Sequence, residues 1–118
     1  MGYRIDYALR DGCLRAIVSG KSSLEHAASI ARDIADQASR ESVEHLLIDV
    51  RNLLGRVGTL GALLAPQGVA RRVAVLDVSD NDPYYVFSET SARMRGRSLR
   101  YFYDPAAAVR WLRSSAAD

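Results

Sequence analysis

Three regularly spaced glycines follow an apolar run and form the most conspicuous candidate for a functional loop. Gly55, Gly58 and Gly61 come after "LLIDV", and the apolar segment "ALLAP" follows them. A phosphate-binding P-loop requires a lysine and then a hydroxyl residue after its last glycine, whereas alanine and leucine follow Gly61. A dinucleotide-binding loop requires two glycines separated by one residue. Neither motif is present, so an anion would have to rely on backbone N–H groups with Arg51 or Arg56 nearby.

Two aspartates stand where acid–base chemistry is expected in α/β proteins. Asp49 and Asp77 lie near the carboxyl ends of the two most apolar strand segments. Such a pair would suit general acid–base catalysis or Mg²⁺ binding, and the alternative is that each caps a loop through nearby backbone. No nucleophile or third ligand accompanies the pair, and neither His26 nor His45 has a metal ligand at suitable spacing. We therefore expect no enzyme, no metal site and no cofactor.

The length and composition are those of one globular domain. The chain has 118 residues, of which 48% are hydrophobic and 25% charged, and its formal net charge is +2. No apolar run approaches the ~20 residues that cross a bilayer, and the start of the chain lacks a secretory signal. A single cysteine, Cys13, excludes an internal disulfide. We predict one cytoplasmic domain over residues 1–118, without integral membrane contact.

Basic residues are too few and too scattered to indicate nucleic acid as a partner. The densest cluster is Arg93, Arg95, Arg97 and Arg100. We interpret it as a solvated helix end, where cations suit the negative end of the helix dipole. Nucleic-acid-binding domains are usually more basic and carry interleaved aromatic residues. No nucleic-acid partner is therefore predicted.

Hydrophobic periodicity predicts strands that alternate with helices. The first two strands read as a hairpin because a glycine turn joins them, and two later strands are apolar on both faces. The expected strands are 3–9, 13–20, 45–50, 71–78 and 98–104, and the expected helices are 22–41, 58–68, 82–96 and 104–118. The fold class is α/β. The predicted sheet has five strands and is mostly parallel, with an N-terminal antiparallel hairpin strand and about four flanking helices.

Capping residues and apolar stripes define the first and last helices. Ser22 and Glu25 form a capping box, while Asp104 caps the last helix and Pro105 occupies its first turn. The predicted inner face of the first helix comprises Leu24, Ala27, Ala28, Ala31, Ile34, Ala35 and Ala38. That of the last helix comprises Ala108, Trp111 and Leu112.

Several segments carry a resemblance that covers nearly the whole chain. They are "GCLRAIVSGK" with the helix after it, "HLLIDVRNLLG", "VAVLDV" and "LRYFYDPAAAVRWL". Together they resemble the STAS domains, also called SpoIIAA-like or anti-sigma-factor-antagonist domains, and more closely the small stand-alone bacterial SpoIIAA-like proteins. The resemblance implies a SpoIIAA-like fold and a non-enzymatic regulatory or protein-interaction module.

The phosphorylation turn of the antagonist members is altered in this sequence. In those members a partner kinase phosphorylates a serine in an Asp-Ser-Ser-Gly turn at the start of the second helix. In "RVGTLGALL", Arg56 stands in place of the aspartate and Gly58 in place of that serine, and Thr59 is displaced by one position. The resemblance implies Thr59 as the candidate phosphosite, and the alternative is an ordinary helix cap.

The loop and short helix after the third strand are expected to dock onto an unidentified protein partner. The interaction or ligand candidates are Arg51, Leu54, Arg56, Thr59, Leu60, Leu63, Tyr84 and Tyr85. The architecture also resembles CRAL-TRIO lipid-binding domains. The alternative is therefore a small-molecule binder, for a lipid-like or anionic ligand, at a groove formed by residues 51–64 and 84–87. The same apolar side chains would otherwise form core and a homodimer face.

Overall fold

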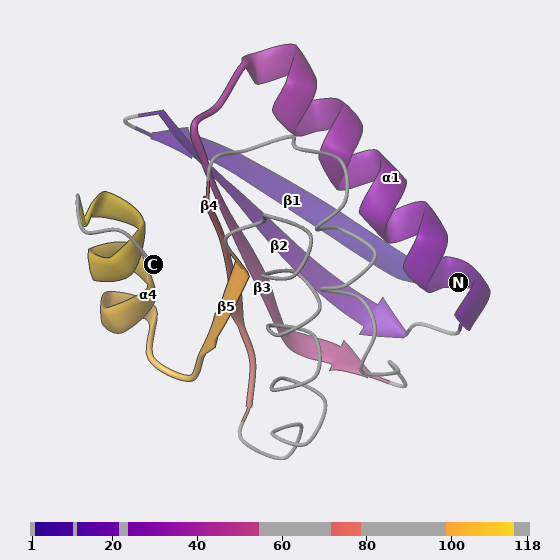
Figure 1. Cartoon of the computed structure of the whole chain (residues 1–118). Helices are drawn as coiled ribbons and strands as arrows, with labels where there is room; N and C mark the ends of the chain where they lie inside the picture. The colour runs from indigo at the N-terminus through magenta and orange to yellow at the C-terminus, as the bar shows by residue number, and fades with distance from the viewer. Residues whose placement is uncertain (1, 11, 22–23, 55–71, 79–98, 115–118) are drawn as a thin grey trace.

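The structure, a computed structural model, describes residues 2–10, 12–21, 24–54, 72–78 and 99–114, with side chains for all of these except 24–28 and 54. They form five strands and two helices (Figure 1). In chain order these are β1 (Tyr3–Arg10), β2 (Cys13–Lys21), α1 (Leu24–Glu41), β3 (His45–Leu54), β4 (Arg72–Leu76), β5 (Leu99–Phe102) and α4 (Pro105–Arg113).

The strands form one sheet, and their order in space follows their order in the sequence, β1-β2-β3-β4-β5. The predicted hairpin is confirmed, since β1 pairs antiparallel with β2. The other neighbouring strands pair parallel. The sheet is therefore mixed, and the expectation of a mostly parallel sheet is corrected, because β1 is a full member of the sheet that pairs along its whole length.

The helix count also differs from the prediction. The part of the chain that the structure describes contains two helices, α1 and α4, rather than about four. The expected helices at 58–68 and 82–96 lie outside the described residues, as does Ser22 of the expected capping box. Among the strands, β3 continues beyond the predicted end at residue 50 as far as Leu54.

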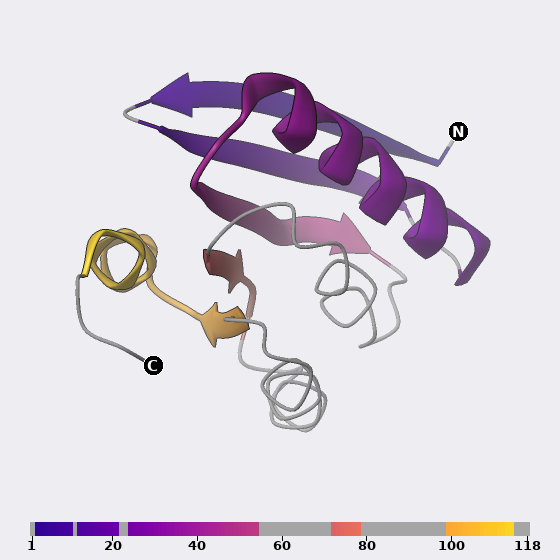
Figure 2. The same ribbon diagram turned by 45° about the horizontal axis from the view of Figure 1, so that its top comes forward.

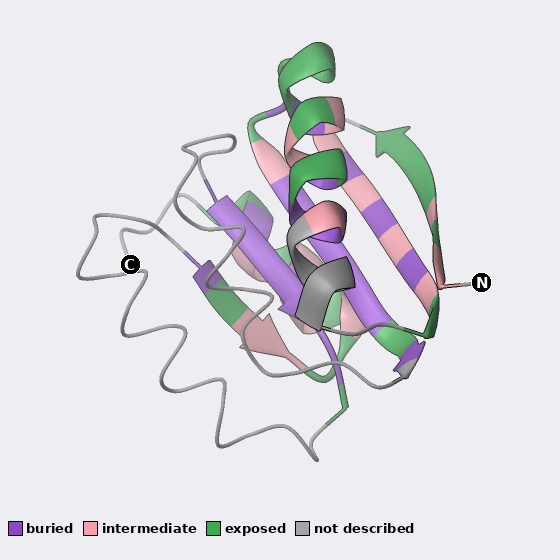
Figure 3. Cartoon of the chain, turned by 90° about the vertical axis from the view of Figure 1, so that its right-hand side faces the viewer, coloured by how far each residue is buried: buried purple, intermediate pink, exposed green. Residues whose placement is uncertain are grey.

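The face of the sheet covered by α1 holds the larger core. Figure 2 shows α1 lying across β1, β2 and β3. The alternation of β2 places Leu14, Ala16 and Val18 under the helix, and Figure 3 shows this strand as alternating buried and intermediate bands. The helix contributes four buried residues to this core, namely Ile30, Ala31, Ile34 and Ala38. Three of these belong to the predicted stripe, and Ile30 is an addition to it.

The opposite face is partly covered by α4. Ala108 and Leu112 of α4 pack against Leu47, Ala74 and Leu76 of the two central strands. The predicted N-cap is confirmed, because the Asp104 carboxylate accepts a hydrogen bond from the Ala107 N–H at 3.2 Å. Both central strands are buried on both faces, as their continuous apolar sequences predicted.

The first strand is less buried than its alternating sequence suggested. Tyr3 and Ile5 pack against the α1-side core, but Tyr7 is 37% exposed and Leu9 is 52% exposed. The four residues occupy every second position of β1 and therefore share one face of the sheet. Their register partners likewise occupy every second position of β2. Only the first half of β1 is therefore half-buried, because β1 is an edge strand whose second half has little cover among the described residues.

Candidate functional site

The carboxyl end of β3 contains a β-bulge that sets the geometry of the candidate site. Between Ile17 and Ser19 the strand β2 advances by two positions, while β3 advances from Asp49 to Asn52. The additional residue in β3 interrupts the ladder of backbone hydrogen bonds. Asp49 Oδ1 accepts a hydrogen bond from the backbone N–H of Arg51 at 3.1 Å. The carboxylate thus satisfies a backbone donor within the bulge.

The same carboxylate holds the Arg51 side chain through two further hydrogen bonds. Arg51 Nε donates to Asp49 Oδ1 at 3.0 Å, and Arg51 Nη2 donates to Asp49 Oδ2 at 2.8 Å. This fork geometry matches a planar guanidinium to a carboxylate. The Asp49 side chain is 8% exposed and that of Arg51 is 40% exposed. Asp49 therefore holds the side chain of Arg51 in place, and that side chain is still partly exposed to solvent.

Electrostatics keep this pair ionised. Burial raises the pKa of Asp49, but the hydrogen bonds and the charge of Arg51, together with the charge of Arg15, outweigh it and lower the pKa below its ordinary value. The hydrogen bond to Asp49 raises the pKa of Arg51. A carboxylate held in this way has little tendency to take up a proton near neutral pH. The pair is consequently suited to fixing a side chain rather than to general acid–base catalysis.

Asp77, the second aspartate considered from the sequence, points away from the first. Its backbone N–H donates to the carbonyl of Phe102 at 2.9 Å, which continues the pairing of β4 with β5. It follows Leu76, the register partner of Asp49, so the alternation of an extended chain turns it to the opposite face. Its carboxylate accepts the Val78 N–H at 2.7 Å. Asp49 therefore bonds to the bulge within β3, Asp77 bonds to the backbone just after β4, and the two do not form an acid–base pair.

Among the predicted site residues, the structure places Arg51 and the backbone of Leu54, both at the carboxyl end of β3. The other candidates, Arg56, Thr59, Leu60, Leu63, Tyr84 and Tyr85, lie outside the described residues, as does most of the predicted groove. Those assignments stay predictions. Within the described ranges, His, Cys, Asp and Glu side chains form no group of three that would hold a metal ion. No described helix is long and apolar enough to span a bilayer.

Two exposed apolar residues extend the site along the same edge of the sheet. Val78 is 40% exposed and lies two residues after the end of β4, and Tyr103 is 50% exposed and directly follows β5. Since the carboxyl ends of parallel strands meet at one edge, both belong to the edge that carries Arg51. We call this the carboxyl edge, defined by Lys21, Arg51, Val78 and Tyr103. The sequence pattern placed both residues inside the expected strands 71–78 and 98–104 and therefore did not identify them as site residues.

Replacement of Asp49 by asparagine isolates the ion pair, because asparagine keeps an oxygen that can accept the Arg51 N–H. We expect Asp49→Asn to lower the free energy of unfolding by about 1.5 kcal/mol at pH 7. The folded-state pKa of Asp49 lies below its unfolded value, about 3.9. The contribution of the ionised Asp49 to the free energy of unfolding is therefore complete above about pH 4. It is lost as the pH falls through the folded-state pKa. Urea denaturation at several pH values would contradict this if the deficit of the variant grew on acidification.

Comparison with known proteins identifies the fold. No protein-family model matches the chain. No curated protein sequence matches it either. An anti-sigma factor antagonist from Mycobacterium paratuberculosis is similar in structure, with a TM-score of 0.66 at 17% identity over 96% of both chains. An uncharacterised DUF3478-family protein with a SpoIIAA-like fold from Shewanella loihica has a TM-score of 0.59 at 17% identity over 94% of both chains.

A third structure, the STAS domain of an antisigma-factor antagonist from Rhodobacter sphaeroides, has 13% identity, covers 98% of this chain and 96% of its own, and reaches a TM-score of only 0.31. The fold assignment therefore depends on the first two structures, which cover almost the whole chain. The resemblance read from the sequence is confirmed at the level of architecture. The chain has the α/β SpoIIAA-like fold of the anti-sigma-factor antagonists.

Proposed function

We propose that this protein is a non-enzymatic regulatory module that acts in the cytoplasm and docks onto a protein partner through its carboxyl edge. The loop and short helix expected after β3 would provide the contact segment, with Arg56, Thr59, Leu60 and Leu63. The fold supports a role in protein interaction at a coarse level, since one similar structure is an anti-sigma factor antagonist.

The observation that carries this proposal is the anchored guanidinium of Arg51 at the base of the contact segment. Its hydrogen bonds to Asp49 restrict its rotamers before any partner binds, so less side-chain entropy is lost on association. Arginine is enriched among the residues that dominate interface energies. The exposed side chains of Val78 and Tyr103 add apolar area at the same edge. The proposed surface thus combines one arginine with two exposed apolar side chains from the same edge of the sheet.

Truncation of Arg51 should weaken partner binding while leaving the bulge intact, because the backbone N–H that Asp49 accepts is retained. We expect Arg51→Ala to reduce recovery of the natural partner, in co-purification from native cells, by about tenfold, the effect of ~1.4 kcal/mol. Circular dichroism would verify folding of the variant.

The matched control is Arg110→Ala, which removes an exposed arginine from α4, outside the carboxyl edge. It should leave recovery of the partner unchanged. Equal recovery by wild type and Arg51→Ala would contradict docking through the carboxyl edge. If Leu60→Asp recovered as much of the natural partner as the wild type, with its fold and oligomeric state unchanged, docking through the contact segment would be contradicted.

Self-association is the second interaction that we propose. The supporting observation is the exposure of Tyr7 and Leu9 on the edge strand β1, whose outer backbone edge pairs with no other strand of the sheet. Light scattering on the purified protein measures the oligomeric state directly. A monomeric mass at all accessible concentrations would contradict a homodimer without affecting the proposal for the carboxyl edge.

A further inference from the structure

A groove of about 330 Å³ lies at the opposite edge of the sheet, between the tip of the β1–β2 hairpin and α4. It is lined by ten residues from β1, β2, β3 and α4, namely Ala8, Leu9, Arg10, Cys13, Arg15, His45, Leu47, Val109, Leu112 and Arg113. We call it the α4 groove. The parallel strands β2 and β3 contribute their amino ends to it, so it is separate from the carboxyl edge.

The floor of the groove is apolar. Leu47 is 1% exposed and Leu112 is 2% exposed, and the partly buried Val109 packs against the same core cluster. The thiol of Cys13 is also partly buried there. Such a floor favours the apolar part of a ligand, because contact with it removes hydrocarbon surface from water. The volume lies at the small end of the range for small-molecule sites, about 300–1,000 Å³.

The charged side chains among the described residues of the lining all have one sign. Arg10, Arg15 and Arg113 are cationic and His45 is the fourth basic residue, and none of the described lining residues is an aspartate or glutamate. Arg10 and Arg15 form no ion pair with another described residue, although the charge of Arg15 also acts on the more distant carboxylate of Asp49. The three arginines come from β1, β2 and α4, and they line the same groove as the apolar floor. This distribution complements a ligand that carries a negative charge on an apolar body.

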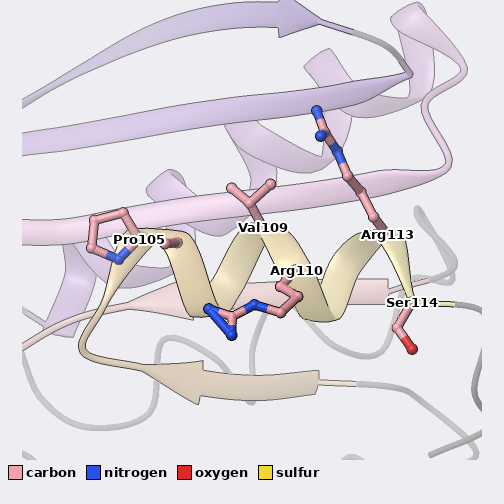
Figure 4. Close-up of a pocket in the computed structure, with 6 residues that line it drawn as sticks. Pro105, Val109, Arg110, Arg113 and Ser114 are labelled. Carbon is pink, nitrogen blue, oxygen red and sulfur yellow. The ribbon is translucent and has the colours of Figure 1, made fainter.

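Two of the arginines that line the groove, Arg15 and Arg113, both act on the thiol of Cys13. Burial raises the pKa of the Cys13 thiol, while the charges of Arg15 and Arg113 act on the same thiol in the opposite direction. Arg15 lies in β2 and Arg113 at the end of α4, so the fold brings them together from distant parts of the sequence. Figure 4 draws a neighbouring pocket on α4, which shares Val109 and Arg113 with the groove, and shows these two side chains extending from α4 toward the strands.

We propose that the α4 groove binds a small organic anion, a carboxylate or phosphate carried on an apolar body. The apolar part contacts Leu47, Val109 and Leu112, and the anionic group lies near Arg15 and Arg113. Arg10 adds positive potential to the same lining. The site is independent of the proposed docking function, because none of its residues belongs to the carboxyl edge.

The test uses two fluorescent probes that share an aromatic body. Anilinonaphthalene sulfonate carries an anionic group, and N-phenyl-1-naphthylamine lacks it. We expect the wild-type protein to bind the sulfonate more tightly than the neutral probe. Arg15→Gln and Arg113→Gln should each weaken binding of the sulfonate about three- to fivefold, the effect of one partly exposed charge contact, and leave the neutral probe unchanged. Arg110→Gln, on the same helix but outside the groove lining, is the matched control.

A second variant tests the groove without altering any charge. Ala8 is exposed and lines the groove, so Ala8→Trp should fill it and abolish saturable binding of both probes. Alkylation of Cys13, the only cysteine in the chain, gives an independent readout. Iodoacetamide should react with it more slowly when the sulfonate is bound, and Arg113→Gln should weaken this protection. Competition by hexanoate and by hexyl phosphate then identifies the preferred anionic group.

Three outcomes would overturn the proposal. They are equal affinity of the two probes for the wild type, unchanged sulfonate binding in both arginine variants, and unchanged binding by a folded Ala8→Trp protein. Each variant is first checked for cooperative urea unfolding, since the sulfonate also binds to loosely packed states. Failure of the carboxyl-edge experiments would leave these results unaffected.

Discussion

Replacing Arg72 by methionine should lower the free energy of unfolding by about 3 kcal/mol, because two charge-assisted hydrogen bonds are lost from a buried position. Arg72 is 9% exposed at the start of β4. Its Nη1 donates to the carbonyl of Trp111 at 2.6 Å and to that of Ser114 at 2.8 Å. It thus places a cation at the carboxyl end of α4, where the helix dipole is negative.

The matched control for this prediction is Arg100→Met. Both guanidinium groups lie over the Trp111 ring, that of Arg72 at 5.2 Å and that of Arg100 at 5.7 Å from its centre. Arg100 is exposed, so its replacement should cost less than about 1 kcal/mol. Urea denaturation compares the two variants. If Arg72→Met lowered the free energy of unfolding no more than Arg100→Met does, stacking on Trp111 would account for the whole effect. That result would contradict a stabilising role for the hydrogen bonds from Arg72 to the last carbonyls of α4.

Replacing Gly20 by alanine is expected to have an effect of similar size. Gly20 has a φ of +104°, and a Cβ there would lie 2.5 Å from the carbonyl oxygen of Gly2. That oxygen accepts the Lys21 N–H at 2.8 Å, so relief of the clash would disturb the pairing of β1 with β2. The obstruction is backbone and cannot move aside as a flexible side chain would. We expect a loss of about 3 kcal/mol from the free energy of unfolding.

Gly12 provides the control for Gly20, because it separates backbone strain from steric overlap. It lies at the other end of the hairpin with a φ of +76°, and a Cβ added there would meet nothing within 4 Å. Gly12→Ala should therefore cost about 1 kcal/mol, from the left-handed conformation alone. Chemical denaturation of both variants measures the difference. Equal losses at the two positions would show that the close approach of Gly20 to Gly2 does not contribute.

Local patterns in the sequence were sufficient to predict most of the helices and strands in the described ranges. The helix that begins at Pro105 follows from Asp104 as its cap and from the spacing of Ala108 and Leu112, and the structure confirms all three. The hairpin follows from alternation and the turn at Gly12. Such features depend on residues a few positions apart, whose backbone preferences and capping bonds are nearly independent of the rest of the fold.

The candidate site was harder to predict, because it depends on register. Asp49 and Asp77 occupy equivalent places in their sequences, yet sheet pairing turns them to opposite faces. The bulge that lets Asp49 hold Arg51 arises from a one-residue offset between β2 and β3. The exposure of Tyr7 is another case, because the regular alternation of β1 does not reveal how well each part of an edge strand is covered.

From the sequence alone, one can derive the succession of strands and helices, the apolar central strands and the helix cap at Asp104, because short-range periodicity and backbone geometry govern them. Only the tertiary structure shows that Arg15 and Arg113 line the same groove and that Arg72 binds the carbonyls at the end of α4. These contacts link distant segments through strand order, register and helix placement. They depend on how the whole sheet packs, which no local pattern of residues encodes.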